Sequence, residues 1–233
     1  MYKDAIDVSY LKLFRNEGFT KYLKQETDFT IKEEVLSIIK PNNIVLEKTD
    51  AAQASVIVKR KGGGHGSGFA ISNDGYIITN YHVIAGKTNS NTEPLKIITS
   101  EGEELDVAVV RVNKFRDLAL LKVTKTFEKA FVVSSTKTFK NMQDAYTIGA
   151  PKSLELGQSI SAGVISNERK ANNNNLLQLG MSVNAGNSGG PLFDATGILH
   201  GVIVSKLVGE NTEGVSFAIP SYLIEEYLKI KIN

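Results

Sequence analysis

Short apolar runs separated by turn residues fill the chain from about residue 44 onward. Residues 69–72 and 76–79 flank Asn73-Asp74-Gly75, a sequence typical of the tight turn of a β-hairpin. Further strands are predicted at 55–59, 95–99, 105–112, 118–123, 131–134, 145–148, 163–166, 176–179, 192–193, 201–205 and 214–218. So many short strands at close spacing predict an all-β fold, built as paired antiparallel barrels or as a sandwich.

The two ends of the chain carry apolar residues at helical spacing instead. Near the N-terminus a capping box at residues 30–33 begins a run of such positions that ends before Pro41. These positions are Ile31, Val35, Ile38 and Ile39. We therefore predict a partly helical N-terminal appendage over residues 1–43 and a main unit over residues 44–233. Apolar positions 222, 223, 227, 228 and 230 predict a closing C-terminal helix.

Composition narrows the class of protein. The 233 residues are 42% hydrophobic and 22% charged, which suits a soluble globular protein. The formal net charge is only +2, so nucleic acid is not expected as a main partner. No run of about 18 apolar residues occurs, so no membrane span is expected. The N-terminus lacks the apolar core of a signal peptide and the chain has no cysteine, so we expect a cytoplasmic protein.

One serine lies in a dense cluster of glycines, in the sequence NAGNSGGPL at residues 184–192. A serine hydroxyl becomes a nucleophile when a neighbouring base takes its proton, and the oxyanion that forms needs backbone N–H donors. Glycine lets the backbone follow an unusual path at no steric cost. Gly186 and Ser188 are thus expected to present N–H groups, with Gly189 and Gly190 leaving room for a substrate chain. A histidine and an acid are then required elsewhere in the chain.

Three histidines are available as the base. His82 directly follows a predicted strand and is the strongest candidate. His65 lies in the glycine tract GGGHGSG, which is expected to be too flexible to hold a base, and His200 is expected to be a surface or half-buried strand residue. Asp117 precedes a strongly apolar strand and lies between His82 and Ser188 in the sequence. We predict His82, Asp117 and Ser188 as the catalytic residues.

Four segments of the chain resemble the trypsin-like serine endopeptidases of chymotrypsin fold, most closely the bacterial HtrA/Deg protease domain. They are GSGFAISNDGYIITNYHVI around His82, DLALLKV at Asp117, NAGNSGGPL around Ser188 and GVSFAIPS at residues 214–221. The resemblance implies two six-stranded antiparallel β-barrels with the three catalytic residues in the cleft between them. It also implies an oxyanion hole formed by the amides of Gly186 and Ser188, with Asn187 as a further candidate. Since the chain stops after its closing helix, the PDZ domain that usually follows in this family is expected to be absent.

Several positions depart from the family pattern. Asn187 stands where digestive trypsin-like enzymes carry the aspartate that binds a newly cleaved N-terminus, so we expect control by loop ordering rather than by such cleavage. Residues 179–182 read LGMS where the family usually has TDAA, and Val204 stands where a hydroxyl residue is often found beside the acid. The resemblance implies a substrate-binding set of Ser182, Val183, Asn184, Ser205, Lys206 and Leu207. None of them is an aspartate, so we expect cleavage after small or medium-sized apolar residues.

Three functions stay open on the sequence alone. They are a serine endopeptidase acting on protein or peptide substrates, a catalytically inert protein that uses the same fold for binding, and an esterase. The esterase is disfavoured because the serine loop leads into a strand, whereas a helix follows a nucleophile elbow. No cofactor or metal is expected, since the histidines are scattered and have no carboxylate at ligand spacing. Residues 1–43 are expected to pack on the main unit, with a homo-oligomer contact or a regulatory partner as the alternative.

Overall fold

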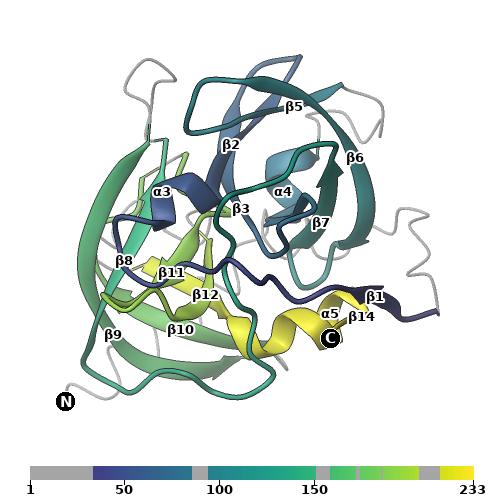
Figure 1. The fold of residues 1–233 in the computed structure, drawn as a ribbon. Helices are drawn as coiled ribbons and strands as arrows, with labels where there is room; N and C mark the ends of the chain where they lie inside the picture. Colours follow the sequence, from purple (N-terminus) through teal and green to yellow (C-terminus); the bar gives the residue numbers. More distant parts are fainter. Residues whose placement is uncertain (1–33, 86–93, 151–157, 172–173, 185, 205–215) are drawn as a thin grey trace.

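The computed structural model describes residues 34–85, 94–150, 158–171, 174–184, 186–204 and 216–233 (Figure 1). One set of strands consists of β2 (Ser55–Arg60), β3 (His65–Ala70), β4 (Tyr76–Thr79), β5 (Leu95–Ile98), β6 (Glu104–Asn113) and β7 (Leu118–Val123). A second set consists of β8 (Gln143–Gly149), β9 (Ser159–Ala171), β10 (Asn174–Gly180), β11 (Pro191–Phe193), β12 (Leu199–Val204) and β13 (Ser216–Pro220). Each set closes into a barrel, in the orders β2-β3-β4-β7-β6-β5 and β10-β13-β12-β11-β8-β9. The predicted fold of two six-stranded antiparallel barrels is confirmed.

The hairpin between β3 and β4 shows how the turn residues set the register. Gly75 has a φ of 104°, a conformation that L-residues with a side chain rarely adopt. A Cβ atom at this position would lie 2.4 Å from the carbonyl oxygen of Val123, at the end of the neighbouring β7. The turn therefore requires glycine both for its backbone angle and for the close approach of β7, and the predicted hairpin is confirmed.

The glycine tract GGGHGSG before this hairpin was expected to be flexible, but it forms a turn and the first part of a strand. Gly63 and Gly64 form a turn with φ values of 94° and 84°, and β3 begins at His65. His65 is paired with Lys59 of β2 in the ladder. The glycines reflect positive backbone angles and close packing, so this part of the prediction is wrong.

Three phenylalanines connect the cores of the two barrels. Phe131 lies between Phe69 of the first barrel and Phe193 of the second, with ring centroids 5.5 and 5.4 Å apart, and all three are fully buried. Residues 131–134 were predicted as a strand but form no ladder. Here the chain passes from one barrel to the other, and the apolar residues that suggested a strand are buried in this connection instead.

The first and last strands of the described chain pair with each other beside the barrels (Figure 1). Strand β1 (Leu36–Ile38) runs parallel to β14 (Ile230–Ile232), with Leu36 opposite Ile230. The predicted helix over residues 31–39 is therefore wrong for its described part, because pairing with a distant segment overrides a short local pattern. The described part of the appendage thus packs on the main unit, while the division of the chain at residue 43 stays a prediction.

The closing helix is shorter than expected. A 3₁₀ turn (Ser221–Leu223) leads into α5 (Ile224–Leu228), and Lys229 then adopts a left-handed conformation with φ 50° and ψ 53°. This residue ends the helix, and the chain leaves it as β14. The prediction of a C-terminal helix is confirmed up to Leu228 and wrong for the last residues.

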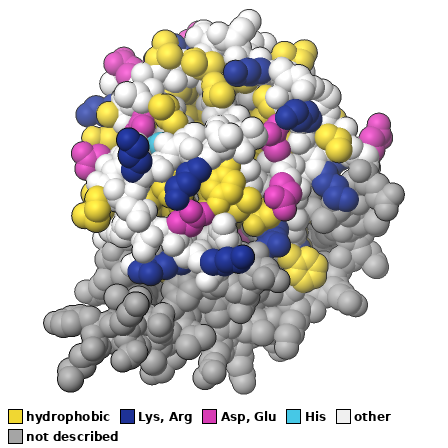
Figure 2. Space-filling view, turned by 90° about the horizontal axis from the view of Figure 1, so that it is seen from below, with side chains coloured by type: hydrophobic (Ala, Val, Ile, Leu, Met, Phe, Trp, Pro, Cys, Tyr) yellow, Lys and Arg dark blue, Asp and Glu magenta, His cyan; other side chains and the backbone are white. Residues whose placement is uncertain are grey.

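The surface carries charges of both signs. On the face drawn in Figure 2, lysines and arginines are interspersed with aspartates and glutamates, with apolar side chains between them. No helix in the described ranges is both long enough and apolar enough to span a bilayer.

Candidate active site

A histidine and an aspartate of the first barrel are joined by two hydrogen bonds. His82 lies in the short helix α4 (Tyr81–Ile84), and Asp117 directly precedes β7. Nδ1 of His82 lies 2.7 Å from Oδ2 of Asp117, and the backbone N–H of His82 donates to Oδ1 at 2.9 Å. Since an ionised carboxylate only accepts hydrogen bonds, Nδ1 carries a proton, and in the neutral ring Nε2 is then an acceptor. The two side chains are 12% and 16% exposed, so the pair is shielded from most of the solvent.

The turn before β7 aims the Asp117 carboxylate at α4. Asp117 has a φ of 52°, in the left-handed region, which aspartate tolerates better than most residues. Its carbonyl oxygen accepts a hydrogen bond of 3.0 Å from the side-chain amide of Asn80, which lies directly before α4. Asp117 is therefore held at the start of α4 both by its backbone carbonyl and by its two carboxylate oxygens.

Arg60 at the end of β2 holds the other end of α4. Its Nη1 lies 3.3, 3.0 and 3.0 Å from the carbonyl oxygens of His82, Val83 and Ala85. A four-residue helix has almost no stability of its own, so these contacts and the carboxylate of Asp117 define its position. No local pattern predicts this role of Arg60, because its contacts with α4 span 22 residues or more.

Ser188 lies in the loop between β10 and β11 and is 4% exposed. On one side the loop is bonded to β12, since Gly189 N donates to Ile203 O and Ile203 N donates to Gly190 O, both at 2.9 Å. On the other side Ser67 of β3 donates its backbone N–H to the carbonyl oxygen of Ser188 at 2.7 Å. The serine loop is thus held between one strand of each barrel.

The two glycines after Ser188 allow close approach of backbone from both barrels. A Cβ atom at residue 189 would lie 2.2 Å from Ser67 O and 2.3 Å from Thr79 Oγ1, and the residue has a φ of 84°. A Cβ atom at residue 190 would lie 2.5 Å from the carbonyl oxygen of Ile148. The expectation that Gly189 and Gly190 leave space for a substrate chain is therefore wrong, since protein backbone occupies that space.

The same close packing brings Ser188 next to the helix that carries His82. A Cβ atom at Gly66 would lie 2.5 Å from Val83 Cγ2 and 3.0 Å from the carbonyl oxygen of Ser188. A Cβ atom at Gly189 would lie 3.0 Å from the backbone nitrogen of Asn80. The residues beside His82 and the residues beside Ser188 therefore meet at the junction of the barrels.

Of the predicted oxyanion-hole residues, Gly186 and Ser188 keep their candidacy and Asn187 loses it. Gly186 has a φ of 103°, and a Cβ atom there would lie 2.1 Å from Ala150 O. The amide of Asn187 donates to the carbonyl oxygen of Asn184 at 3.1 Å, so it is used inside the loop. The Asn187 side chain is buried, and its Oδ1 has no hydrogen-bond partner within the described ranges.

The predicted substrate-binding residues lie partly within the described chain. Ser182 and Asn184 are exposed in the serine loop, and Val183 packs against the core of the second barrel. Ser205, Lys206 and Leu207 lie outside the described residues. Val204, at the position where a hydroxyl residue was expected, is 4% exposed and belongs to the core.

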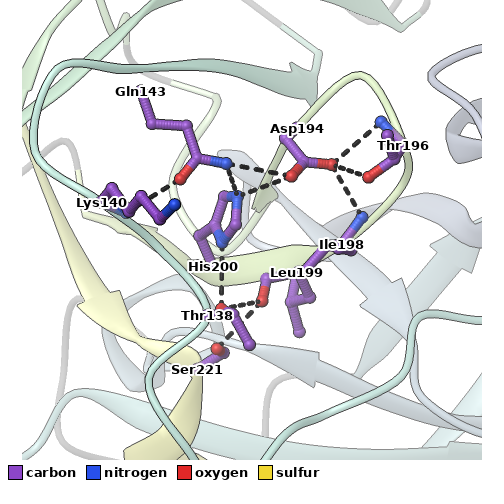
Figure 3. A network of polar contacts seen from close by, with 9 residues as sticks. All are labelled: Thr138, Lys140, Gln143, Asp194, Thr196, Ile198, Leu199, His200 and Ser221. Atoms are coloured by element: carbon purple, nitrogen blue, oxygen red, sulfur yellow. Dashed lines mark hydrogen bonds and ion pairs between the residues drawn. The ribbon is translucent and has the colours of Figure 1, made fainter.

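His200 is wholly buried, in contrast to the surface or half-buried position expected for it. Figure 3 shows its ring between three polar side chains: Thr138 Oγ1 lies 3.0 Å from Nδ1, while Gln143 Nε2 and Asp194 Oδ2 lie 3.2 and 3.3 Å from Nε2. Burial lowers the pKa of His200 below 6.5, an effect that the nearby Asp194 carboxylate opposes in part. This network lies in the second barrel, where it joins β8, β12 and the turn between β11 and β12.

His65 is also fixed, although it was dismissed as part of a flexible tract. Its Nε2 lies 2.8 Å from the carbonyl oxygen of Ala150, in the second barrel. It therefore bonds across the junction of the barrels, and His82 is the histidine that the structure pairs with a carboxylate near Ser188. Within the described ranges no group of three or more histidine, aspartate or glutamate residues is placed to hold a metal ion.

Comparison with known proteins supports this arrangement. The family model of the trypsin-like peptidase domain matches residues 66–202, a range that contains His82, Asp117 and Ser188. The chain belongs to the trypsin-like peptidases. Within that family its relatives are serine proteases of the HtrA type, as the resemblance of the four segments implied.

Two relatives and one solved structure illustrate the similarity. The Do-like serine protease HtrA of Lactococcus lactis is 30% identical over 227 residues, which cover 88% of this chain and 50% of the relative. A probable periplasmic DegP-like serine endoprotease of Brucella suis is 32% identical over 163 residues, 67% of this chain and 30% of the relative. The crystal structure of a serine endoprotease from Yersinia pestis has a TM-score of 0.67 at 31% identity and covers 78% of this chain and 65% of that one. This trypsin-like peptidase chain thus spans half or less of the length of these two relatives.

Proposed function

We propose that this protein is a serine endopeptidase in which Ser188 is the nucleophile, His82 the general base and Asp117 the residue that orients the base. The observation that carries the proposal is the pair of hydrogen bonds between His82 and the Asp117 carboxylate, which leaves Nε2 of the neutral ring as an acceptor. The residues on either side of His82 approach the serine loop. Membership of the trypsin-like family supports the same assignment.

In the proposed reaction, Ser188 Oγ attacks the peptide carbonyl carbon while Nε2 of His82 takes the hydroxyl proton. The tetrahedral oxyanion accepts hydrogen bonds from the amides of Gly186 and Ser188. His82 then gives its proton to the leaving amine, and an acyl-enzyme remains on Ser188. Water, activated by the same base, hydrolyses the ester and releases the second product. Asp117 stays ionised throughout and stabilises the imidazolium.

Protein or peptide chains are the proposed substrates, with a small or medium-sized apolar residue before the scissile bond. Ser182 and Asn184 are exposed and uncharged, and Val183 is half-buried, which suits a pocket without a charged base. This preference can be read from cleavage sites in a denatured proteome treated with wild type and with Ser188→Ala.

A fluorophosphonate probe tests the proposal directly, because it labels only an activated serine. We expect wild type to be labelled and to cleave denatured protein, while Ser188→Ala and His82→Ala lose both activities. Folded wild type that is neither labelled nor proteolytic would instead favour an inert binding protein on the same fold. Cleavage of esters with no cleavage of peptides would favour an esterase.

A further inference from the structure

Ser67 is a buried polar residue of the first barrel that bonds to the serine loop by its backbone and by its side chain. It lies in β3 and is 1% exposed. Its N–H donates to Ser188 O at 2.7 Å, and its hydroxyl donates to Gly186 O at 2.7 Å. The hydroxyl oxygen also lies 3.3 Å from the backbone N–H of Ala150, which donates to it.

The hydroxyl of Ser67 fixes one peptide group of the loop. The carbonyl of Gly186 and the N–H of Asn187 belong to the same peptide plane. Ser67 holds the carbonyl end, and Asn184 O holds the N–H end at 3.1 Å. Because glycine imposes little conformational preference of its own, Gly186 does not fix the orientation of this plane. The orientation of the plane is fixed by the two hydrogen bonds at its ends.

Ser67 also fits its site closely. A Cβ atom at Gly149 would lie 2.8 Å from Ser67 Oγ, and one at Gly190 would lie 3.4 Å from Ser67 Cβ. The carbonyl oxygen of Ser67 accepts a hydrogen bond of 2.7 Å from Thr79 Oγ1. The side chain therefore has little freedom to turn away from Gly186, and its hydroxyl is a rigid contact between the barrels.

We propose that Ser67 is a positioning residue that orients the oxyanion-binding amides of Gly186 and Ser188. Its hydroxyl fixes the peptide plane between Gly186 and Asn187, and its N–H fixes the carbonyl of Ser188. Each donor amide belongs to the peptide plane directly before one of these fixed groups, so Ser67 restricts its orientation through the adjoining backbone. This inference rests on the proposed peptidase function. It assigns the geometry of the serine loop, on the second barrel, to a side chain of the first barrel.

Ser67→Ala tests the hydroxyl while leaving the backbone N–H to Ser188 in place. We expect kcat to fall by roughly 10-fold to 100-fold with a smaller change in KM, because small displacements of oxyanion donors act on the transition state. Affinity for a peptide aldehyde built on a site that wild type cleaves should fall by a similar factor, since its adduct with Ser188 carries the oxyanion. Affinity for the matching peptide alcohol, which forms no adduct, should change little.

Ser55→Ala is the matched control. Ser55 is also 1% exposed, and its hydroxyl donates to Ala51 O at 2.7 Å, outside the serine loop. It should lose stability to a similar degree and keep its kcat and aldehyde affinity. If Ser67→Ala does not fold, Ser67→Cys retains a weaker donor on a slightly larger side chain and should give a loss of the same kind.

The outcomes separate the two proposals. Wild type without fluorophosphonate labelling overturns the peptidase function. If wild type is labelled and active, and the Ser67 variants match Ser55→Ala in kcat and in aldehyde affinity, only the role of Ser67 is overturned.

Discussion

At the residue scale, the two oxygens of Asp117 have separate roles. Oδ1 accepts from the backbone of His82 and Oδ2 from its ring, so one carboxylate fixes both the position and the tautomer of the imidazole. An amide at this position could still accept at Oδ1, but it would present a donor to Nδ1. The backbone contact would survive and the tautomer would be reversed.

Asp117→Asn should therefore fold normally and lose activity. We expect kcat to fall by about 10⁴-fold, because Nε2 would carry the proton and could no longer act as a base. The measurements are kcat on a cleaved peptide and the thermal midpoint. Asp106→Asn is the control, since Asp106 has a side chain that is 95% exposed and that pairs with Lys96 on the described surface. An Asp117→Asn variant with kcat close to that of Asp106→Asn would contradict this role.

At the element scale, strands with strong turn signals were predictable and strands that depend on distant partners were not. The hairpin at Asn73-Asp74-Gly75 is encoded locally, by a glycine that the backbone angle requires. Strand β1 has three residues, and its partner β14 lies at the other end of the chain. Its apolar positions suit a short helix equally well, so only the tertiary pairing decides between the two structures.

The pairing of β1 with β14 predicts opposite sensitivities at adjacent residues. Ile38 is 1% exposed and belongs to the core, whereas Ile39 is 78% exposed. Ile38→Ala should lower the free energy of unfolding by about 2–5 kcal/mol through loss of burial and an added cavity. Ile39→Ala should change it by no more than about 0.5 kcal/mol. Urea denaturation of both variants checks this, and equal losses would contradict the observed strand.

At the scale of the whole molecule, the sequence indicated the proposed catalytic residues but not the residues that position them. Ser188, His82 and Asp117 stand in motifs whose residue types follow from the chemistry. The contacts of Arg60 with α4 and of Ser67 with the serine loop arise only when separate parts of the fold meet. The glycines after Ser188 were misinterpreted for the same reason, because the backbone that approaches them comes from strands distant in the sequence, β3 and β8.

The buried polar contacts of His200 make the stability of the fold depend on pH. Asp194 Oδ1 accepts from the hydroxyl of Thr196 and from the N–H groups of Thr196 and Ile198, and Oδ2 faces Gln143 and His200 (Figure 3). Burial raises the pKa of Asp194, but these hydrogen bonds lower it more, so its pKa lies below 3.8. The carboxylate therefore stays ionised when His200 begins to titrate, and it bonds the turn before β12 to β8.

On acidification the fold should first lose stability through His200, and only at lower pH through protonation of Asp194. In the unfolded chain His200 takes up a proton near pH 6.5, whereas burial holds its pKa lower in the folded state. Below pH 6.5 the unfolded state thus binds more protons, and stability falls with pH until the folded pKa is reached. The contribution of neutral His200 to stability is fully present above pH 6.5.

Urea denaturation of wild type and His200→Gln between pH 7.5 and 4.5 measures this effect. Glutamine does not titrate, so the variant should lose less stability on acidification than wild type, although it starts from a lower value at pH 7.5. His65 and His82 are present in both proteins and cancel in the comparison. Parallel pH dependences would show that His200 takes up its proton equally readily in the folded and unfolded chains, and that its burial has no energetic consequence in this pH range.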